Sequence, residues 1–209
     1  MSTSKALFQL VFLLGISISL VQMQTAQSIR ARFNSSDFKF DLKGSRPFTV
    51  GGGGNGKRAS LIEMPSLKGV GISYGYTELE PCGIVLPHIH PRATEMIYAI
   101  QGRFQVGFVE ENEGRAIIND IGEGETHFFP QGLIHFEQNL ACTKGIFLSA
   151  FTHEDPGALS LPNRLFSLPT QAITSSFNNN EETLKMIQDK LVVSPAAGVG
   201  ECRARCGLN

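Results

Sequence analysis

The chain contains no tryptophan and has no marked excess of charge of either sign. Its 18 lysines and arginines are balanced by 19 aspartates and glutamates. The basic residues are scattered, with pairs such as Lys57-Arg58 but no longer basic run, which argues against a nucleic-acid partner. Long apolar runs are also scarce, because only the first 27 residues contain one that approaches the length of a membrane span. A length of 209 residues with this composition favours one globular domain.

Residues 1–27 differ from the rest of the chain. Lys5 precedes an apolar run from Ala6 to Val21, and a short polar stretch with Ala26 follows. This is the layout of a secretory signal peptide. An uncleaved membrane anchor is the alternative, but at about 1.5 Å per residue the run is shorter than a hydrocarbon core of roughly 30 Å. We therefore expect a mature protein that is secreted, either extracellular or associated with the cell wall, and free of the membrane.

Two further features agree with export. Asn34 opens the sequence Asn-Ser-Ser, which fits the pattern of N-glycosylation, although so short a pattern often occurs by chance. Cysteines are few but even in number, and export makes disulfide bonds the expected state. The four cysteines permit three pairings, and they are Cys82, Cys142, Cys202 and Cys206.

Short runs typical of β-strands recur between residues 57 and 157. Turn-forming residues separate them and no helical pattern intervenes, which indicates a β-sandwich or β-barrel. The runs are Ala59–Met64, Gly69–Leu79, Ile84–His90, Glu95–Ile100, Arg103–Val109, Arg115–Ile118, Thr126–Phe129, Ile134–Gln138 and Gly145–Phe151. Before them, residues 28–56 are expected to form an N-terminal arm and a flexible glycine-rich loop at Gly51–Gly54. That loop does not match a phosphate-binding motif.

The pattern becomes helical after the last strand. Residues 158–193 are expected to contain a short helix over Thr170–Phe177 and a second from Glu181 to about Val192. Asn180 is placed to cap the second helix. Its apolar stripe is expected to pack, either on the domain or on a neighbouring subunit, and it consists of Leu184, Ile187 and Leu191. Residues 194–209 form a tail that contains two of the cysteines.

Three residues of one stretch suit a metal ion. His88 and His90 are two apart, so both imidazoles of a strand would point to the same side. Pro91 marks the end of that strand, and Glu95 would then open the next one. A pair of histidines at this spacing is more often found on a surface or in a satisfied core. With Glu95 and a fourth candidate, His135, nearby, metal binding becomes the better explanation of the two histidines. The four residues together predict one metal site.

The ligand types narrow the choice of metal. Imidazole suits Zn, Cu, Fe and Ni, whereas a carboxylate suits harder ions such as Mn. A set of three histidines and one glutamate, with no cysteine, leans towards Mn or Fe and leaves Zn open. Such a centre carries net positive charge and could bind a small anion.

The two stretches resemble the two motifs of the cupin superfamily. The first is His88-x-His90-x4-Glu95-x6-Gly102, and the second runs from Gly124 through Pro130-x-Gly132-x2-His135 to Asn139. The sequence from Pro87 to Glu95 resembles germins, germin-like proteins and spherulins. This resemblance implies a jelly-roll β-barrel that binds one Mn ion through His88, His90, Glu95 and His135. It also implies C-terminal helices that join subunits into a homo-oligomer, and activities that include oxalate oxidase and superoxide dismutase.

The chain departs from that family at several positions. Cys82 occupies the place of a motif glycine, and Val85 and Gly75 occupy the places of two asparagines that contact substrate in oxalate oxidases. The cysteine pair usual near the mature N-terminus is missing. Because His88 and His135 would face each other on antiparallel strands, Cys82 should lie near Cys142. A Cys82–Cys142 bridge is therefore predicted, although the two residues have the wrong parity without a bulge.

Two hypotheses for the function follow. The first is a secreted Mn-dependent oxidoreductase that acts on a small anion, with superoxide dismutation preferred to oxalate oxidation because the two asparagines are missing. The second is a non-catalytic extracellular structural, storage or stress protein that keeps the metal for stability and has no substrate. Other polar residues have structural interpretations: His127 lines the barrel mouth, His153 lies on a surface loop, and Asn139 satisfies a turn.

Overall fold

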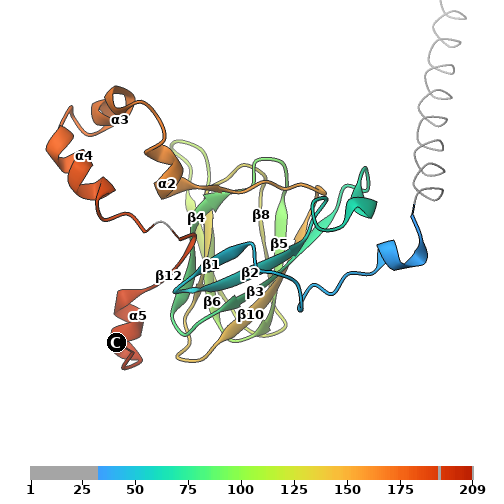
Figure 1. Ribbon diagram of the computed structural model, residues 1–209. Helices are drawn as coiled ribbons and strands as arrows, with labels where there is room; N and C mark the ends of the chain where they lie inside the picture. Colours follow the sequence, from blue (N-terminus) through green and yellow to red (C-terminus); the bar gives the residue numbers. More distant parts are fainter. Residues whose placement is uncertain (1–32, 193, 209) are drawn as a thin grey trace, which may run out of the picture.

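The computed structural model describes residues 33–192 and 194–208, and the predicted signal peptide at residues 1–27 lies outside them. Two antiparallel sheets face each other and form a β-barrel (Figure 1). One sheet has the strand order β1-β2-β3-β10-β5-β8, and the other has β11-β4-β9-β6-β7 with β12 paired to β4. The predicted all-β jelly-roll class with C-terminal helices is confirmed.

From β4 to β10 the strand boundaries lie close to the predicted runs. The first sheet consists of β1 (Thr49–Gly51), β2 (Gly54–Ala59), β3 (Ser73–Leu79), β10 (Gly145–Phe151), β5 (Glu95–Gln101) and β8 (Thr126–Phe129). The second consists of β11 (Leu159–Ser160), β4 (Gly83–Ile89), β9 (His135–Asn139), β6 (Phe104–Val109), β7 (Ala116–Ile121) and β12 (Ala196–Gly198). Buried and partly exposed residues alternate along β10 and β9, as expected for strands with one face on a core.

An apolar core fills the end of the barrel where β3 ends and β10 begins. Its residues are Leu79, Ile97, Ala99, Phe104, Val106, Ile121, Phe129 and Phe147. Each fully buried Val, Leu, Ile or Phe side chain contributes roughly 1.5–3 kcal/mol relative to exposure. Since Phe151 and Glu95 are paired at the other end of β10 and β5, the core fixes the strands and leaves that other end free for polar side chains.

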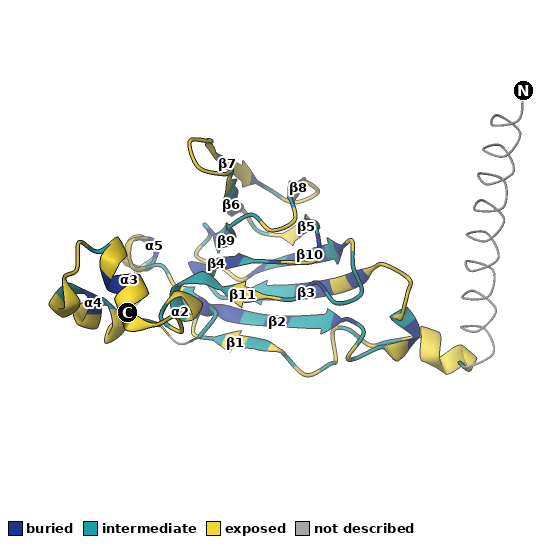
Figure 2. Cartoon of the chain, turned by 90° about the horizontal axis from the view of Figure 1, so that it is seen from above, coloured by how far each residue is buried: buried dark blue, intermediate teal, exposed yellow. Residues whose placement is uncertain are grey.

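The helices lie outside the barrel. They are the 3-10 turns η1 (Ser35–Phe38) and η2 (Pro65–Leu67), followed by α2 (Leu161–Leu165), α3 (Thr170–Ser176), α4 (Glu181–Gln188) and α5 (Gly200–Arg205). Helices α3 and α4 project from one side, and most of their surface is exposed (Figure 2). The predicted cap of α4 is present, because Asn180 accepts a hydrogen bond from the Thr183 amide.

Several expected boundaries are wrong. The range assigned to the arm contains two strands, since β1 starts at Thr49 and β2 at Gly54, and the predicted glycine-rich loop is the short turn between them. Residues 60–64 form turns instead of continuing a strand. Strand β7 continues to Ile121, beyond the predicted end of its run at Ile118. Helix α4 ends at Gln188, before the predicted Val192, and α2 was not anticipated.

The glycine run is explained by close backbone approach. A Cβ atom on Gly53 would lie 1.9 Å from the carbonyl oxygen of Ala197, and one on Gly83 would lie 1.9 Å from that of Gly53. The C-terminal segment therefore crosses directly over the β1–β2 turn, and only glycine leaves room for it. No helix within the described ranges is both long enough and apolar enough to cross a membrane.

Candidate metal centre

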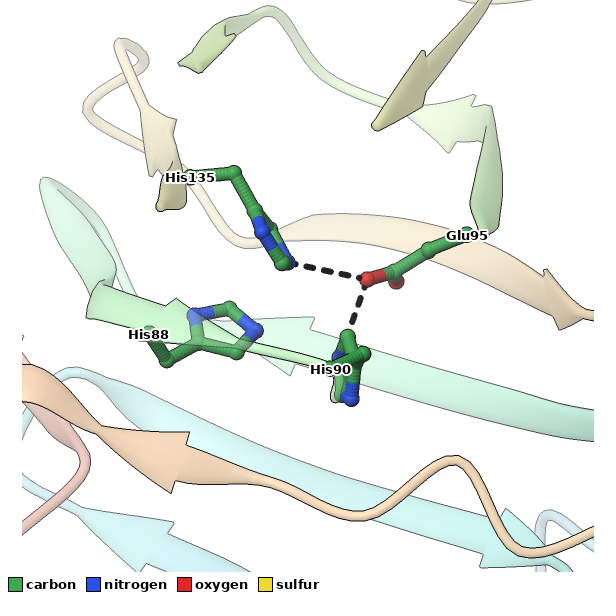
Figure 3. A group of neighbouring side chains, drawn as sticks. All are labelled: His88, His90, Glu95 and His135. Carbon is green, nitrogen blue, oxygen red and sulfur yellow. Dashed lines mark ion pairs between the residues drawn. The ribbon is translucent and has the colours of Figure 1, made fainter. Parts of the chain in front are cut away.

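His88, His90, Glu95 and His135 converge at the polar end of the barrel (Figure 3). Strands β4 and β9 are antiparallel neighbours, and their register places His88 directly opposite His135. His90 follows the end of β4, and Glu95 opens β5 after the turn at residues 91–94. One ligand atom from each residue lies within 4.8 Å of the others, and all four residues are buried. The structure thus brings together all four predicted residues.

Backbone carbonyls hold the three imidazole rings. The Nδ1 atom of His88 lies 3.0 Å from the Leu86 oxygen, that of His90 lies 2.5 Å from the Gly157 oxygen, and that of His135 lies 2.8 Å from the Leu133 oxygen. A carbonyl only accepts, so we assign the proton of each neutral ring to Nδ1. The lone pair of each Nε2 is left free, which is the usual arrangement of histidines that bind metals.

The resulting group has four acceptors and no donor. Oε2 of Glu95 is 3.1 Å from Nε2 of His90 and 3.3 Å from Nε2 of His135. These distances suit hydrogen bonds, but neither Nε2 carries a proton in the assigned tautomers. Among the residues described, Glu95 Oε2 and His135 Nε2 are buried without a hydrogen-bond partner. Because such atoms are costly to bury unpaired, the residues fit a bound cation.

The pKa values of these four residues reflect their burial and their closeness to one another. Burial, together with the neighbouring His135 and His90, lowers the pKa of His88 to about 3. Burial also opposes protonation of His90, but the Glu95 carboxylate and the Gly157 carbonyl raise its pKa overall. Burial works against ionisation of Glu95, yet the neighbouring His135 and His90 lower its pKa. Without a metal, a proton on His90 beside Glu95 can therefore replace part of the missing positive charge.

A cavity of about 90 Å³ opens beside the group. His88, His90 and Glu95 lie on its wall, and the remaining lining combines apolar side chains with Arg58 and several hydroxyl side chains. Since one water needs only about 10–15 Å³ by a comparable measure, the cavity has room for several waters or a small ligand. Val85 and Gly75 also line it. Hence the two positions where oxalate oxidases of the resembled family carry asparagines face this cavity without a side-chain hydrogen-bonding group.

Sequence reasoning missed Glu137, which is fully buried and lines the same cavity. Neither of its carboxylate oxygens has a hydrogen-bond partner within the described residues. Burial, followed by repulsion from Glu95, raises the pKa of Glu137 well above its usual value. Strand parity could have found it, because His135 and Glu137 are two apart on β9 and therefore share the inner face.

The other polar candidates have structural surroundings. Asn139 is fully buried; its amide donates to the carbonyls of Glu80 and Thr143 and its oxygen accepts from the Ala141 amide. The expectation that it satisfies turn backbone is confirmed. Nε2 of His127 is 3.2 Å from the Asn119 side chain, and its ring contacts aromatic rings outside the cavity.

Two candidates lie in loops. His153 accepts a hydrogen bond from the Asp155 amide in the loop after β10. Asn34 is exposed immediately before η1, which leaves its predicted glycosylation untested.

The cysteines pair differently from the prediction. Cys82 is bonded to Cys202 and Cys142 to Cys206, so the predicted Cys82–Cys142 bridge is wrong. The two residues are near each other, since the Cys82 amide donates to the Ala141 carbonyl. Both residues lie outside the strands, and the C-terminal segment supplies the partner of each. Cys82 has a φ of 60°, which explains why the related motif has glycine at this position.

Comparisons with known proteins agree with this fold and site. The family model described as "Cupin" matches residues 40–185, and the chain therefore belongs to the cupin family. The chain is 39% identical to Spherulin-1B of Physarum polycephalum over 175 residues, which cover 83% of this chain and 71% of that protein. It is also 36% identical over 131 residues to a probable germin-like protein, subfamily 2 member 5, of Arabidopsis thaliana, covering 62% and 61% of the two chains.

A solved structure has the same arrangement of strands. Recombinant oxalate oxidase in complex with glycolate matches with a TM-score of 0.69 and 25% identity, over 76% of this chain and 82% of that one. The predicted relationship to spherulins and germin-like proteins is thus confirmed.

Proposed function

We propose that this protein is a secreted, manganese-binding germin-like cupin that acts on a small anion, with superoxide dismutation as its preferred reaction. The observation that carries the proposal is the buried group of three imidazole Nε2 lone pairs and one carboxylate, which converge without a donor. A carboxylate among imidazoles favours Mn or Fe over Zn, and the germin-like resemblance favours Mn. Bound manganese would supply one-electron exchange with an anion at a coordination position that the protein leaves open.

The protein's own residues hold and shield the site. The carbonyls of residues 86, 133 and 157 fix the tautomer and direction of each imidazole ring. Glu95 is best explained as a metal ligand, because its Oε2 faces two imidazole nitrogens and its pKa is lowered. Phe129 stacks on His135 at 4.6 Å and Phe151 contacts His90 at 4.8 Å between ring centres. Phe151 lies on the cavity wall and Phe129 does not, so apolar rings shield the imidazoles both inside the cavity and outside it.

The cavity wall favours a small anion other than oxalate. The two asparagine positions of the related oxalate oxidases are filled by Val85 and Gly75, so the wall lacks both of those amide donors, although Arg58 and several hydroxyl side chains also line it. Oxalate oxidation remains the second candidate because a structural relative at 25% identity is an oxalate oxidase.

Export and assembly are parts of the same proposal. Two disulfide bonds within residues 33–192 and 194–208 suit an oxidising compartment outside the cell. Exposed Asn34 is available for glycosylation. Helices α3 and α4 project from the barrel and expose Leu168, Met186 and Val192 on or beside them. We propose that they join a second copy of the chain into a homo-oligomer.

Metal analysis and two activity assays test the function. The protein is purified from its native source, its bound metals are measured by mass spectrometry, and superoxide and oxalate turnover are assayed. We expect manganese, with superoxide turnover that is lost together with the metal in His88→Ala. The matched control is His153→Ala, which removes a histidine outside the site.

Each other outcome has a definite meaning. Oxalate turnover with none of superoxide would select the second reaction. If the protein binds metal but has neither activity, the hypothesis that it is an enzyme would be refuted. The alternative, an extracellular protein that keeps the ion for stability, would then remain. A native protein without bound metal would refute the metal centre.

A further inference from the structure

The C-terminal segment, residues 194–208, forms a strap across the start of β4. Strand β12 pairs with β4, with Ala196 opposite Val85 and Gly198 opposite Gly83. Helix α5 follows, and Figure 1 shows it below β12 beside the barrel. Both disulfide bonds attach this strap: Cys202 of α5 to Cys82 before β4, and Cys206 at the end of α5 to Cys142 after β9.

The two bonds differ in accessibility and touch each other. Cys142 is exposed and Cys206 is half-buried, whereas Cys82 and Cys202 are buried. The Sγ atoms of Cys82 and Cys206, which belong to different bonds, are only 3.5 Å apart. Sulfur atoms of Cys82, Cys202 and Cys206 lie within 4.8 Å of one another. A thiol in solution can therefore reach the Cys142–Cys206 bond. The buried Cys82–Cys202 bond can be reached only by a sulfur atom of the cluster itself.

The Arg205 guanidinium lies beside the sulfur of Cys202, which would be the leaving group if the Cys82–Cys202 bond were attacked at Cys82. Nη2 of Arg205 lies 3.2 Å from Sγ of Cys202 and donates to the Leu140 carbonyl at 2.8 Å. A guanidinium beside a sulfur stabilises its thiolate, and a more stable thiolate leaves faster in exchange. Cys202 and Cys206 are four residues apart, so they lie one helical turn from each other on the same face of α5.

We propose that the four cysteines form a thiol–disulfide exchange site that accepts a dithiol at Cys142–Cys206 and passes the exchange inward to Cys82–Cys202. A thiolate of the dithiol attacks Sγ of Cys142, the bond to Cys206 breaks, and Cys206 leaves with the electron pair as a thiolate. The second thiol of the reactant then resolves the mixed disulfide at Cys142. The dithiol leaves as its oxidised disulfide, and its two electrons and two protons pass to the protein.

The inner step moves a bond without further reduction. The Cys206 thiolate attacks Sγ of Cys82, the Cys82–Cys206 bond forms, and the Cys82–Cys202 bond breaks. Cys202 leaves with the electron pair beside Arg205 and takes up a proton. The strap stays attached to Cys82, but the attachment point shifts along α5 by four residues, or about 6 Å. The product has free thiols at Cys142 and Cys202.

Limited reduction followed by mapping of the thiols tests the proposal. The full-length secreted protein is treated with one equivalent of dithiothreitol, quenched in acid, alkylated with a maleimide and digested without further reduction. We expect labels on Cys142 and Cys202, together with a peptide that contains a Cys82–Cys206 bond. Labels confined to Cys142 and Cys206, with Cys82–Cys202 intact throughout, would overturn the inner step. Early labels on Cys82 and Cys202 with Cys142–Cys206 intact would overturn the order of attack.

A variant removes the need for a reductant. In Cys142→Ser the Cys206 thiol is free from the start, so the label should divide between Cys206 and Cys202. Label on Cys206 alone would refute the exchange. Adding Arg205→Gln to this variant should reduce the Cys202 label, because the leaving thiolate loses its cation. Arg203→Gln removes the same charge from α5 and is the matched control. If Cys142→Ser fails to fold, the experiment on the unaltered chain still decides.

Discussion

Replacement of Glu137 by glutamine should stabilise the metal-free protein, and increasingly so as the pH rises. The side chain is fully buried, and both of its oxygens lack a hydrogen-bond partner in the described part of the chain. Burial and the nearby charge of Glu95 raise its pKa well above the usual value. Glutamine has nearly the same shape and no charge to lose, so the two side chains differ mainly in their titration.

The sign follows from proton binding in the two states. Above a pH of about 4.5 the unfolded chain has released the proton of Glu137, whereas the folded protein still holds it. The contribution of Glu137 is therefore fully present below the unfolded pKa and is lost as the pH rises towards the raised folded pKa. For one proton the loss is at most about 1.4 kcal/mol per pH unit. Between pH 5 and 7, Glu137→Gln should gain up to about 2.7 kcal/mol over the unaltered protein.

Urea unfolding at pH 4.5, 6 and 7, with the disulfide bonds intact, measures the gap in unfolding free energy between Glu137→Gln and the unaltered protein. The free energies of unfolding should be nearly equal at pH 4.5 and diverge above it. Glu111→Gln, at an exposed carboxylate, is the control and should show no such trend. Loading with manganese should narrow the gap, because a cation beside Glu95 also favours the charged form of Glu137. A gap that stays constant over this range would refute the assignment of a raised pKa to Glu137.

Three further changes test the fold around the site. Asn139→Ala removes three hydrogen bonds from a buried side chain and should lower the unfolding free energy by about 2–4 kcal/mol in urea titrations; an unchanged midpoint would contradict its role. With Cys202→Ala in both proteins, Cys82→Gly should be about 1 kcal/mol more stable than Cys82→Ala, because only glycine adopts a φ of 60° without strain; equal melting temperatures would show that the strain is absent. Asn180→Ala should lose about 1 kcal/mol through the cap of α4, seen as earlier hydrogen exchange of the Thr183 amide, and protection equal to that of the unaltered chain would count against the cap.

Local patterns in the sequence were sufficient for the barrel strands and for the four ligand candidates. Strands β8 and β10 have the predicted bounds, because alternating burial and turn residues act over a few neighbouring positions. The ligand group was predictable for the same reason. His88 and His90 share a strand face, a proline turn separates them from Glu95, and the second motif provides His135 at the head of its strand.

Contacts between distant segments decided the remainder. The pairing of Cys82 with Cys202 spans 120 residues and depends on where the C-terminal strap returns, which no local pattern encodes. The glycine run at residues 51–54 looked like a flexible loop, but its small size serves the strap that crosses it. Strand parity places Glu137 on the inner face of β9, but its lack of a partner arises only when β9 packs against the facing sheet. Sequence by itself thus determined which side chains could bind a metal, and the tertiary structure decided which neighbours shape the cavity and connect the sulfurs, because those interactions require the folded chain.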